Sequence, residues 1–257
     1  MVKVAFWNIN MGKTSSEGRR RTFDTWCHEM NLDLLLLEEV GNTFSQTDLE
    51  NLTGMQGLAF VNTLDKNDNP TNKQLWALQK HGNPYQARAL RFPGLEQKRM
   101  LLKVTNPTWK DFSLWVIHAN ASKKGGQAAV AAVKDHISKD KGAIVGGDFN
   151  YPINSVGSVA KHPYSWQTTP PAQVSLNFTQ WNKIDGNTKG PDPNLHIVKT
   201  GTVIYKKIDP HNVIDYVMKG ANRTVNSLPN CENPTAETRW IEILREFDHC
   251  PVVYNIT

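Results

Sequence analysis

The chain has 257 residues, and 29 Lys and Arg residues against 24 Asp and Glu residues give a formal net charge of +5. This length suits one large domain with a sizeable core, and we expect a single catalytic domain over residues 1–257. The mild positive charge favours a polyanionic partner but does not identify one. No run approaches the roughly 18 apolar residues that a membrane span needs.

The start of the chain lacks the pattern of a signal peptide, so either the protein is not exported by that route or the chain is a mature form. The three cysteines, Cys27, Cys231 and Cys250, are too few for a disulfide framework and lack metal-finger spacing. A bridge between Cys231 and Cys250 is the alternative to free thiols, which are the expected state.

The first elements are predicted to be a strand over 2–8, an amphipathic helix that carries Phe23, Trp26 and Met30 behind a serine cap, and a buried strand over 33–40. The second strand ends in Glu38 and Glu39. Because neighbouring side chains of a strand point to opposite faces, one carboxylate can enter a pocket while the other faces away. A surface pair of glutamates is the alternative interpretation.

Residues 41–70 are predicted to be mostly loop. Strands over 74–79, 99–105 and 112–118 follow, and then a core helix over 126–137. This order is a meander rather than a strict alternation of strands and helices, and it favours an α+β fold with antiparallel pairing. His118 stands at the end of one of these strands, where a hydrogen-bonded structural histidine is the alternative to a catalytic one.

A short apolar run over 144–150 ends in Asp148 and Asn150. In an extended segment the i and i+2 side chains face the same way, so both are expected in one pocket. An ordinary glycine-containing turn is the alternative. Residues 151–210 are predicted to be a long functional loop region with short strands. Asp215 then lies inside a strand over 213–218, where an unpaired charge would be costly.

The chain resembles the endonuclease/exonuclease/phosphatase superfamily, whose fold is DNase I-like. The resemblance is carried by segments that occur in the order and spacing of that superfamily: Trp7-Asn8-Ile9-Asn10, Leu36-Leu37-Glu38-Glu39-Val40, Ile117-His118-Ala119, Gly147-Asp148-Phe149-Asn150, Ile214-Asp215-Tyr216 and Asp248-His249-Cys250-Pro251-Val252. It implies a four-layered α/β sandwich of two mostly antiparallel sheets flanked by helices. Within the superfamily, residues 39–42 and 117–120 are most similar to the catalytic B subunit of cytolethal distending toxins.

The resemblance implies a catalytic role for four residues. His249 would touch the scissile phosphate, and Asp215 would orient its ring. Asp148 would position or deprotonate the attacking water, and His118 would protonate the leaving oxygen. A carboxylate partner for His118 is expected from residues 60–80, where Asp65 and Asp68 are the acidic choices.

The resemblance also implies metal and phosphate ligands. Glu39 falls at the Mg²⁺-binding glutamate, with Mn²⁺ or Ca²⁺ as alternatives to Mg²⁺. The remaining implied ligands are Asn10 and Asp248 for the metal, and Asn8, Arg99 and Asn150 for phosphate or substrate. The sequence departs from the family pattern at Glu38, where Gln is usual, at Phe247, where Ser is usual, and at Asn10, where Asp is frequent. The loss of a negative charge at Asn10 predicts weaker Mg²⁺ binding.

The function implied by the resemblance is a divalent-metal-dependent endodeoxyribonuclease that hydrolyses phosphodiester bonds of DNA. It would act inside target cells as part of a secreted bacterial toxin, with delivery or binding subunits as partners. The basic residues at 19–21 and 123–124 would contact phosphates or form a solvated face. The alternatives are a phosphoinositide phosphatase, a sphingomyelinase-like phosphodiesterase and a non-catalytic binding module.

Overall fold

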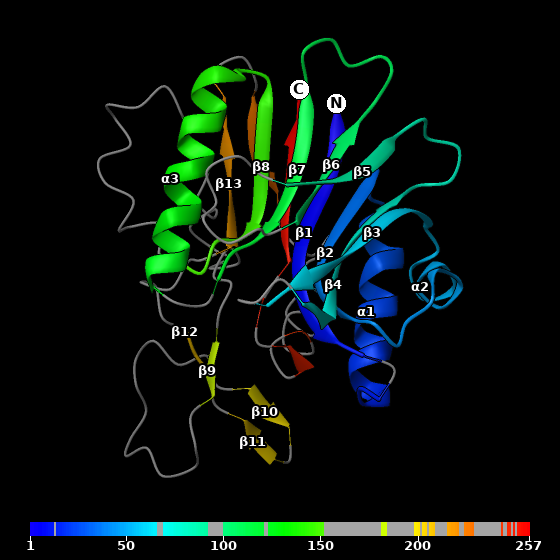
Figure 1. The fold of residues 1–257 in the computed structure, drawn as a ribbon. Helices are drawn as coiled ribbons and strands as arrows, with labels where there is room; N and C mark the ends of the chain where they lie inside the picture. Colours follow the sequence, from blue (N-terminus) through cyan, green and yellow to red (C-terminus); the bar gives the residue numbers. More distant parts are fainter. Residues whose placement is uncertain are drawn as a thin grey trace.

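The structure, a computed structural model, describes residues 1–12, 14–65, 69–91, 100–120, 123–151, 181–183, 198–200, 202–204, 206–208, 215–220, 224–228, 243, 246, 247, 249 and 251–257. Two β-sheets lie face to face and helices cover their outer sides (Figure 1). The predicted four-layered α+β sandwich is confirmed.

The first sheet has the strand order β14-β15-β1-β2-β4-β3. Its strands are β1 (Val2–Met11), β2 (Leu34–Gly41), β3 (Gln56–Leu64), β4 (Pro70–Gln79), β14 (Val225–Leu228) and β15 (Val252–Ile256). The outer face of this sheet is covered by α1 (Glu17–Met30) and α2 (Gln46–Thr53) (Figure 1). The apolar residues between this sheet and its helices include Trp7, Trp26 and Phe247, and the Trp7 ring lies 4.8 Å from Trp26 and 4.7 Å from Phe247.

The second sheet has the order β13-β8-β7-β6-β5. Its strands are β5 (Gln86–Arg91), β6 (Met100–Thr105), β7 (Ser113–His118), β8 (Ala143–Asp148) and β13 (Asp215–Lys219), and α3 (Lys123–Lys139) lies on its outer face. Two small antiparallel pairs form separate two-stranded sheets: β9 (Trp181–Lys183) with β12 (Lys206–Ile208), and β10 (Val198–Thr200) with β11 (Thr202–Ile204).

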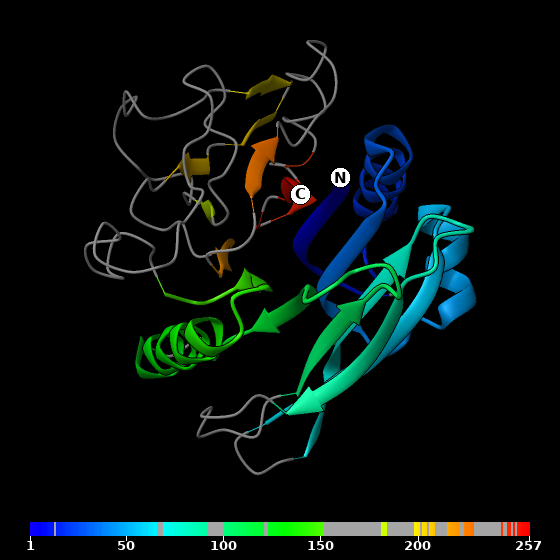
Figure 2. The same ribbon diagram turned by 90° about the horizontal axis from the view of Figure 1, so that it is seen from above.

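The two sheets bury a common apolar layer that includes Phe6, Leu36, Val116 and Val217. Viewed from above, the sheets remain packed against each other, with α3 and α1 on opposite sides (Figure 2). Burial of such apolar area is the main force that holds sheet on sheet. The packing of this apolar layer therefore fixes the positions of the polar residues at the strand ends.

Each sheet contains one parallel pair of strands, β1 with β2 and β7 with β8, and the remaining pairs are antiparallel. The crossovers of the parallel pairs are α1 and α3, which explains why the meander predicted from the sequence is interrupted by helices. Parallel strands end at the same edge of a sheet. The antiparallel neighbours β13 and β15 begin at that edge, so residues from distant parts of the sequence meet there.

The region predicted to be loop over 41–70 contains α2 and β3, and β5 was not predicted at all. A capping box formed by Ser45 and Asp48 begins α2. Both missed strands lie at sheet edges and are only partly buried, so they lack the alternating pattern on which a strand prediction depends.

The predicted amphipathic helix is confirmed as α1, which begins after Ser16 and buries Phe23, Trp26 and Met30. Cys27 on the same helix is a buried free thiol, and Cys231 and Cys250 lie outside the described residues. In the described part of the chain, no helix combines the length and apolar character needed to cross a membrane.

Candidate active site

The strands β1 and β2 lose their regular register where their polar residues begin. The pairing of β1 with β2 shifts after Asn8, and the pairing of β2 with β4 shifts after Leu37. Within these irregular stretches Asn10 and Glu39 have positive φ angles of 39° and 53°, which are uncommon for residues other than glycine. A bulge turns the strand and re-aims its side chains, so the strict alternation of a strand does not apply to Asn10 and Glu39.

Three neighbouring strands of the second sheet bring His118, Asp148 and Asp215 together. His118 ends β7, Asp148 ends β8 and Asp215 opens β13. In the strand register Asp148 lies opposite both His118 and Asp215. Asp148 and Asp215 are 1% and 2% exposed. Two buried carboxyl groups side by side require hydrogen bonds, cations or protonation.

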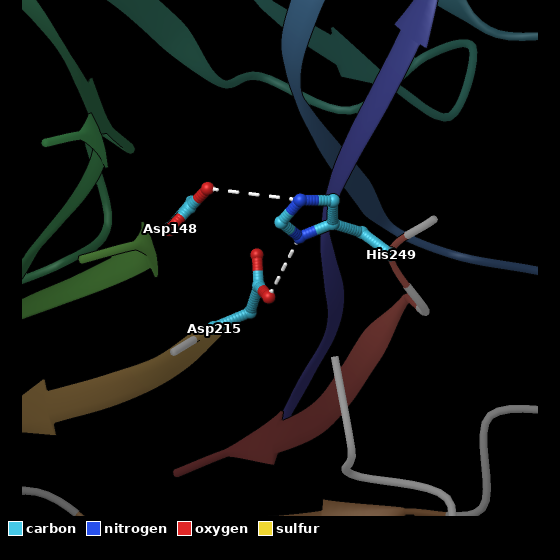
Figure 3. Close-up of side chains that lie close together, drawn as sticks. All are labelled: Asp148, Asp215 and His249. Atoms are coloured by element: carbon cyan, nitrogen blue, oxygen red, sulfur yellow. Dashed lines mark hydrogen bonds and ion pairs between the residues drawn. The ribbon is translucent and has the colours of Figure 1, made fainter. Parts of the chain in front are cut away.

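His249 provides a hydrogen-bond partner from the other side of the sandwich. It lies just before β15, and its Nδ1 is 3.0 Å from Asp215 Oδ2, while its Nε2 is 4.0 Å from Asp148 Oδ2 (Figure 3). The Trp7 indole donates a hydrogen bond of 3.0 Å to the His249 carbonyl oxygen. A carboxylate at Nδ1 selects the tautomer with the proton on that nitrogen, so Nε2 of His249 is directed toward Asp148.

Asp148 is held by hydrogen bonds at both carboxylate oxygens. Its Oδ2 accepts from Asn8 Nδ2 at 3.2 Å and its Oδ1 accepts from the Asn150 backbone N–H at 2.7 Å. Burial and the neighbouring Asp215 raise the pKa of Asp148 to about 7, although His249 acts to lower it. A carboxyl group with a pKa near neutrality can accept or release a proton at physiological pH.

Glu39 joins the two halves of the site. Its Oε1 lies 3.3 Å from His118 Nε2 and accepts from Asn8 Nδ2 at 3.2 Å, and its Oε2 lies 3.4 Å from Lys73 Nζ. Burial acts to raise the pKa of Glu39, but His118, Asn8 and Lys73 outweigh burial, so the pKa lies below its usual value. Glu39 is therefore ionised at neutral pH and carries a negative charge into the site.

Glu38 turns toward the site as Glu39 does, so the expectation that one of the two glutamates faces away is wrong. Glu38 is fully buried, and both of its carboxylate oxygens lie 3.0 Å from the Asp148 backbone nitrogen. The positive φ of Glu39 breaks the alternation of the strand, so both glutamates reach the second sheet. Burial and the nearby Asp148 and Asp215 raise the pKa of Glu38 well above its usual value. Glu38 serves as an acceptor for the Asp148 backbone rather than as a free charge.

One group that could hold a metal ion consists of Asp148, Asp215 and His249, which each offer a ligand atom within 4.8 Å of the others. Two carboxylates and an imidazole are ordinary ligands for a transition metal. In this group, however, Asp215 and His249 already share a hydrogen bond, and a metal would have to replace it.

A second group is formed by Glu39 and Asn10. Both Glu39 Oε2 and Asn10 Oδ1 contact the ammonium group of Lys73, so their oxygens converge on one cation. Asn8 Oδ1 is a further buried oxygen close by in the sequence, and it has no hydrogen-bond partner among the described residues. Carboxylate and amide oxygens are the ligands that Mg²⁺ prefers. The residues present therefore fit a divalent cation, and the oxygen-rich group at Glu39 suits Mg²⁺ better.

Asn150 does not continue the extended strand, contrary to expectation. β8 ends at Asp148, Asn150 has a φ of 48°, and its Nδ2 donates to the Ala119 carbonyl oxygen at 2.9 Å. Because the chain turns at a positive φ, the i and i+2 spacing does not put Asp148 and Asn150 on one extended face. The role of Asn150 in phosphate binding stays a prediction.

Two predicted ligands, Arg99 and Asp248, lie outside the described residues, as does Asp68. The carboxylates that the structure places beside His118 are Glu39 and Asp148, at 3.3 and 4.0 Å from its Nε2. Asp65, the other acidic choice, accepts a hydrogen bond from the Asn69 backbone N–H in its own loop. Asp68 as the carboxylate partner of His118 stays a prediction, and the described neighbours Glu39 and Asp148 were not expected in that role.

Among the basic residues expected to contact phosphates, Arg19 is held within the fold. Its Nε donates to the Glu246 carbonyl oxygen at 2.6 Å, its Nη1 donates to the Asn10 carbonyl oxygen at 2.9 Å, and its guanidinium lies over the Phe247 ring. Arg19 thus ties α1 to the end of β1 and to the segment before His249. The side chains of Arg20, Arg21 and Lys124 are exposed, and that of Lys123 lies outside the described side chains.

Lys73 and the inward position of Glu38 were not found by sequence reasoning. Lys73 stands near the start of β4, where a lysine carries no distinguishing pattern. Only the pairing of β4 with β2, which puts Lys73 opposite Gly41, brings it to the site. For Glu38, the departure from the family's usual Gln was a signal. Glu38 follows the inward alternation of Leu34 and Leu36, and Glu39 is the residue that departs from it.

The comparison with protein families found a match. A model of the endonuclease/exonuclease/phosphatase family matches residues 5–218. A comparison with curated protein sequences found no significant match.

Solved structures resemble the chain at low sequence identity. A functionally unknown conserved protein from Enterococcus faecalis V583 is 15% identical with a TM-score of 0.58, over 99% of both chains. The D. rerio TDP2 complexed with a single strand DNA product is 14% identical with a TM-score of 0.56, over 99% of this chain and 98% of that one. The human Nocturnin catalytic domain with bound sulfate anion is 16% identical with a TM-score of 0.54, over 100% and 93%. At such identities these structures support the fold.

Proposed function

Because the chain belongs to the endonuclease/exonuclease/phosphatase family, we propose that it is a divalent-metal-dependent phosphodiesterase that cleaves DNA as an endonuclease. The observation that carries this proposal is the His249–Asp215 hydrogen bond of 3.0 Å, with Asp148 on the other side of the imidazole ring. Hydrolysis of a phosphodiester requires an activated water, stabilisation of the phosphoryl oxygens and a proton for the leaving oxygen. The described residues can supply each of these.

Asp148 is the candidate base. Its pKa of about 7 lets it take a proton from an attacking water at neutral pH. Asn8 fixes its position, because the Asn8 amide donates to both Asp148 and Glu39. The base is therefore oriented before substrate arrives.

The two histidines complete the proton and charge requirements. His249, with its Nδ1–H on Asp215, presents Nε2; when that nitrogen is protonated it donates to a non-bridging phosphoryl oxygen as negative charge develops there. His118 Nε2 gives its proton to the leaving oxygen, and the neighbouring Glu39 stabilises the protonated ring. A bound divalent cation, held by Glu39 and Asn10, would add Lewis-acid neutralisation of the phosphate.

DNA is the substrate class favoured by the net charge of +5 and by the resemblance in fold to a TDP2 structure that was solved with a DNA product. The fold alone does not select among phosphoesters. As part of the same proposal, the chain acts as the nuclease subunit of a secreted bacterial toxin, which would require delivery subunits. This last part rests on the sequence resemblance.

The test is nicking of supercoiled plasmid with Mg²⁺ and with EDTA, using the wild type and His249→Ala. We expect nicking that EDTA abolishes and a loss of about 10²- to 10⁴-fold in His249→Ala. His81→Ala, at an exposed position, is the matched control and should nick like the wild type. If the plasmid stays intact with the wild type and with both variants, the proposed nuclease function is refuted.

The same preparations should be incubated with phosphoinositides and sphingomyelin. Release of phosphate or phosphocholine without nicking would assign a phospholipid substrate instead of DNA. Failure to hydrolyse any phosphoester would leave the non-catalytic binding module as the remaining alternative.

A further inference from the structure

Lys73 places a positive charge inside the candidate metal site. Its ammonium group lies 3.4 Å from Glu39 Oε2 and donates a hydrogen bond to Asn10 Oδ1. These are two of the three side chains that the family resemblance assigns to the metal, and they come from different strands. The Lys73 side chain is 30% exposed and that of Glu39 is 23% exposed, so the pair is only partly screened by water.

The chain segment around Lys73 explains this position. Lys73 is paired with Gly41 across β4 and β2, two residues beyond Glu39 and just after the stretch where the strand register shifts. Asn10 lies in the corresponding shift of β1 and has a positive φ. The two irregular stretches therefore turn both oxygens toward the lysine of the third strand.

An ammonium group and a divalent cation cannot both contact the same carboxylate oxygen and amide oxygen without strong repulsion. Like charges about 4 Å apart repel each other strongly in a partly buried setting. A lysine is a compact point charge on a flexible stem, so it can withdraw when a metal binds. Withdrawal removes its contact with Glu39, and this loss opposes metal binding.

We propose that Lys73 is an internal cation that competes with the divalent metal for Glu39 and Asn10 and thereby sets the metal concentration at which the site fills. The proposal rests on the metal site of the proposed function but not on the identity of the substrate. Competition by Lys73 is a second cause of weak metal binding, besides the missing negative charge at Asn10. The site holds a positive charge near Glu39 whether or not metal is bound.

The experiment is direct titration of the full chain with Mn²⁺, with free Mn²⁺ measured by electron paramagnetic resonance. We expect Lys73→Gln to bind Mn²⁺ at least about tenfold more tightly than the wild type, because one like charge is removed from contact with a ligand. Lys73→Arg should bind as weakly as the wild type. Equal or weaker binding by Lys73→Gln would overturn the proposal.

The matched control is Lys80→Gln. Lys80 directly follows the other end of the same strand and, like Lys73, donates to an asparagine side chain, here Asn31 Oδ1 at 3.0 Å. Its removal changes the net charge equally, so Mn²⁺ affinity should stay within about twofold of the wild type if only the local charge matters. If Lys73→Gln folds poorly by circular dichroism, Lys73→Met keeps the apolar stem and replaces it in the comparison.

The double variant Glu39→Gln with Lys73→Gln identifies the ligand for which Lys73 competes. We expect it to lose the gain in Mn²⁺ affinity, and a retained gain would overturn the proposal. Plasmid nicking is scored separately. Absence of nicking together with tighter Mn²⁺ binding by Lys73→Gln would refute the nuclease function and leave the competition by Lys73 intact.

Discussion

Glu38 accepts the backbone N–H of Asp148 with both of its carboxylate oxygens, each 3.0 Å from the nitrogen. This contact crosses from the first sheet to the second and fixes the residue that we assign as the base. Because the environment is fully buried, the N–H of Asp148 has no access to water if the acceptor is removed.

Glu38→Ala is expected to lower the free energy of unfolding by about 1 to 3 kcal/mol, because it leaves this buried N–H without an acceptor. Glu38→Gln keeps an acceptor oxygen and should stay within about 1 kcal/mol of the wild type. Urea unfolding measures both variants. Equal destabilisation by Ala and Gln would show that the hydrogen bond to Asp148 is not what Glu38 contributes.

Arg19→Lys is expected to reduce both stability and turnover. A lysine cannot donate from two fixed directions to the carbonyl oxygens of Asn10 and Glu246, as the guanidinium does. We expect a loss of about 1 to 2 kcal/mol in the free energy of unfolding. Arg20→Lys, on the same helix but exposed, should match the wild type in thermal melts, and a similar loss in both variants would contradict the assignment.

Gly147→Ala is expected to be strongly destabilising. The residue has a φ of +131°, and a Cβ there would lie 2.1 Å from the Ile117 carbonyl oxygen and 2.7 Å from Glu38 Oε1. Gly82→Ala measures backbone strain without crowding, because Gly82 has a φ of +83° and a Cβ there would have no atom within 4 Å. We expect about 1 to 2 kcal/mol for Gly82→Ala from backbone strain and about 1 to 3 kcal/mol more for Gly147→Ala from overpacking. Chemical denaturation measures both variants. A larger loss of unfolding free energy in Gly82→Ala than in Gly147→Ala would contradict this explanation.

The stability of the protein is expected to fall in mild acid in part because of His136. This half-buried residue on α3 packs edge-on against Trp115, 5.1 Å between ring centroids, and burial lowers its pKa from 6.5. The unfolded chain then binds a proton at a higher pH than the folded one. The contribution of His136 to the free energy of unfolding is therefore fully present above pH 6.5, and it is lost as the pH falls through the lower pKa of the folded state.

His136→Gln removes this proton uptake and should show a smaller loss of unfolding free energy than the wild type between about pH 7.5 and about pH 5.5. His81→Gln, at an exposed position, is the control. The interpretation fails if His136→Gln and the wild type lose the same free energy over this interval.

The sequence was a good guide to residues at the ends of buried strands. Apolar runs that end in polar residues predicted β2, β7 and β8, and the structure brings Glu39, His118 and Asp148 from their ends to one edge. Regular periodicity was enough there, because the two sheets must bury these strands on both faces. The predicted helix after β1 was confirmed for the same reason, as it buries one face.

Sequence reasoning failed where the chain departs from regular geometry. The alternation rule assumes an extended backbone, and the positive φ angles of Glu39 and Asn150 violate it. The expectations that one of Glu38 and Glu39 faces away and that Asp148 and Asn150 share one extended face were therefore wrong. Lys73 could not be assigned, because its neighbours are brought to it by strand pairing rather than by sequence spacing. No local pattern encodes such a contact.

The candidate site is divided between the two sheets: Asn8 and Glu39 come from the first, and His118, Asp148 and Asp215 from the second. The distances that matter for chemistry are therefore also distances between sheets, and they depend on the apolar layer around residues such as Leu36. A substitution there, such as Leu36→Ala, that loosens the interface without unfolding either sheet should impair turnover as an active-site substitution does. Inactive variants will consequently map to the interior of the sandwich as well as to its catalytic edge.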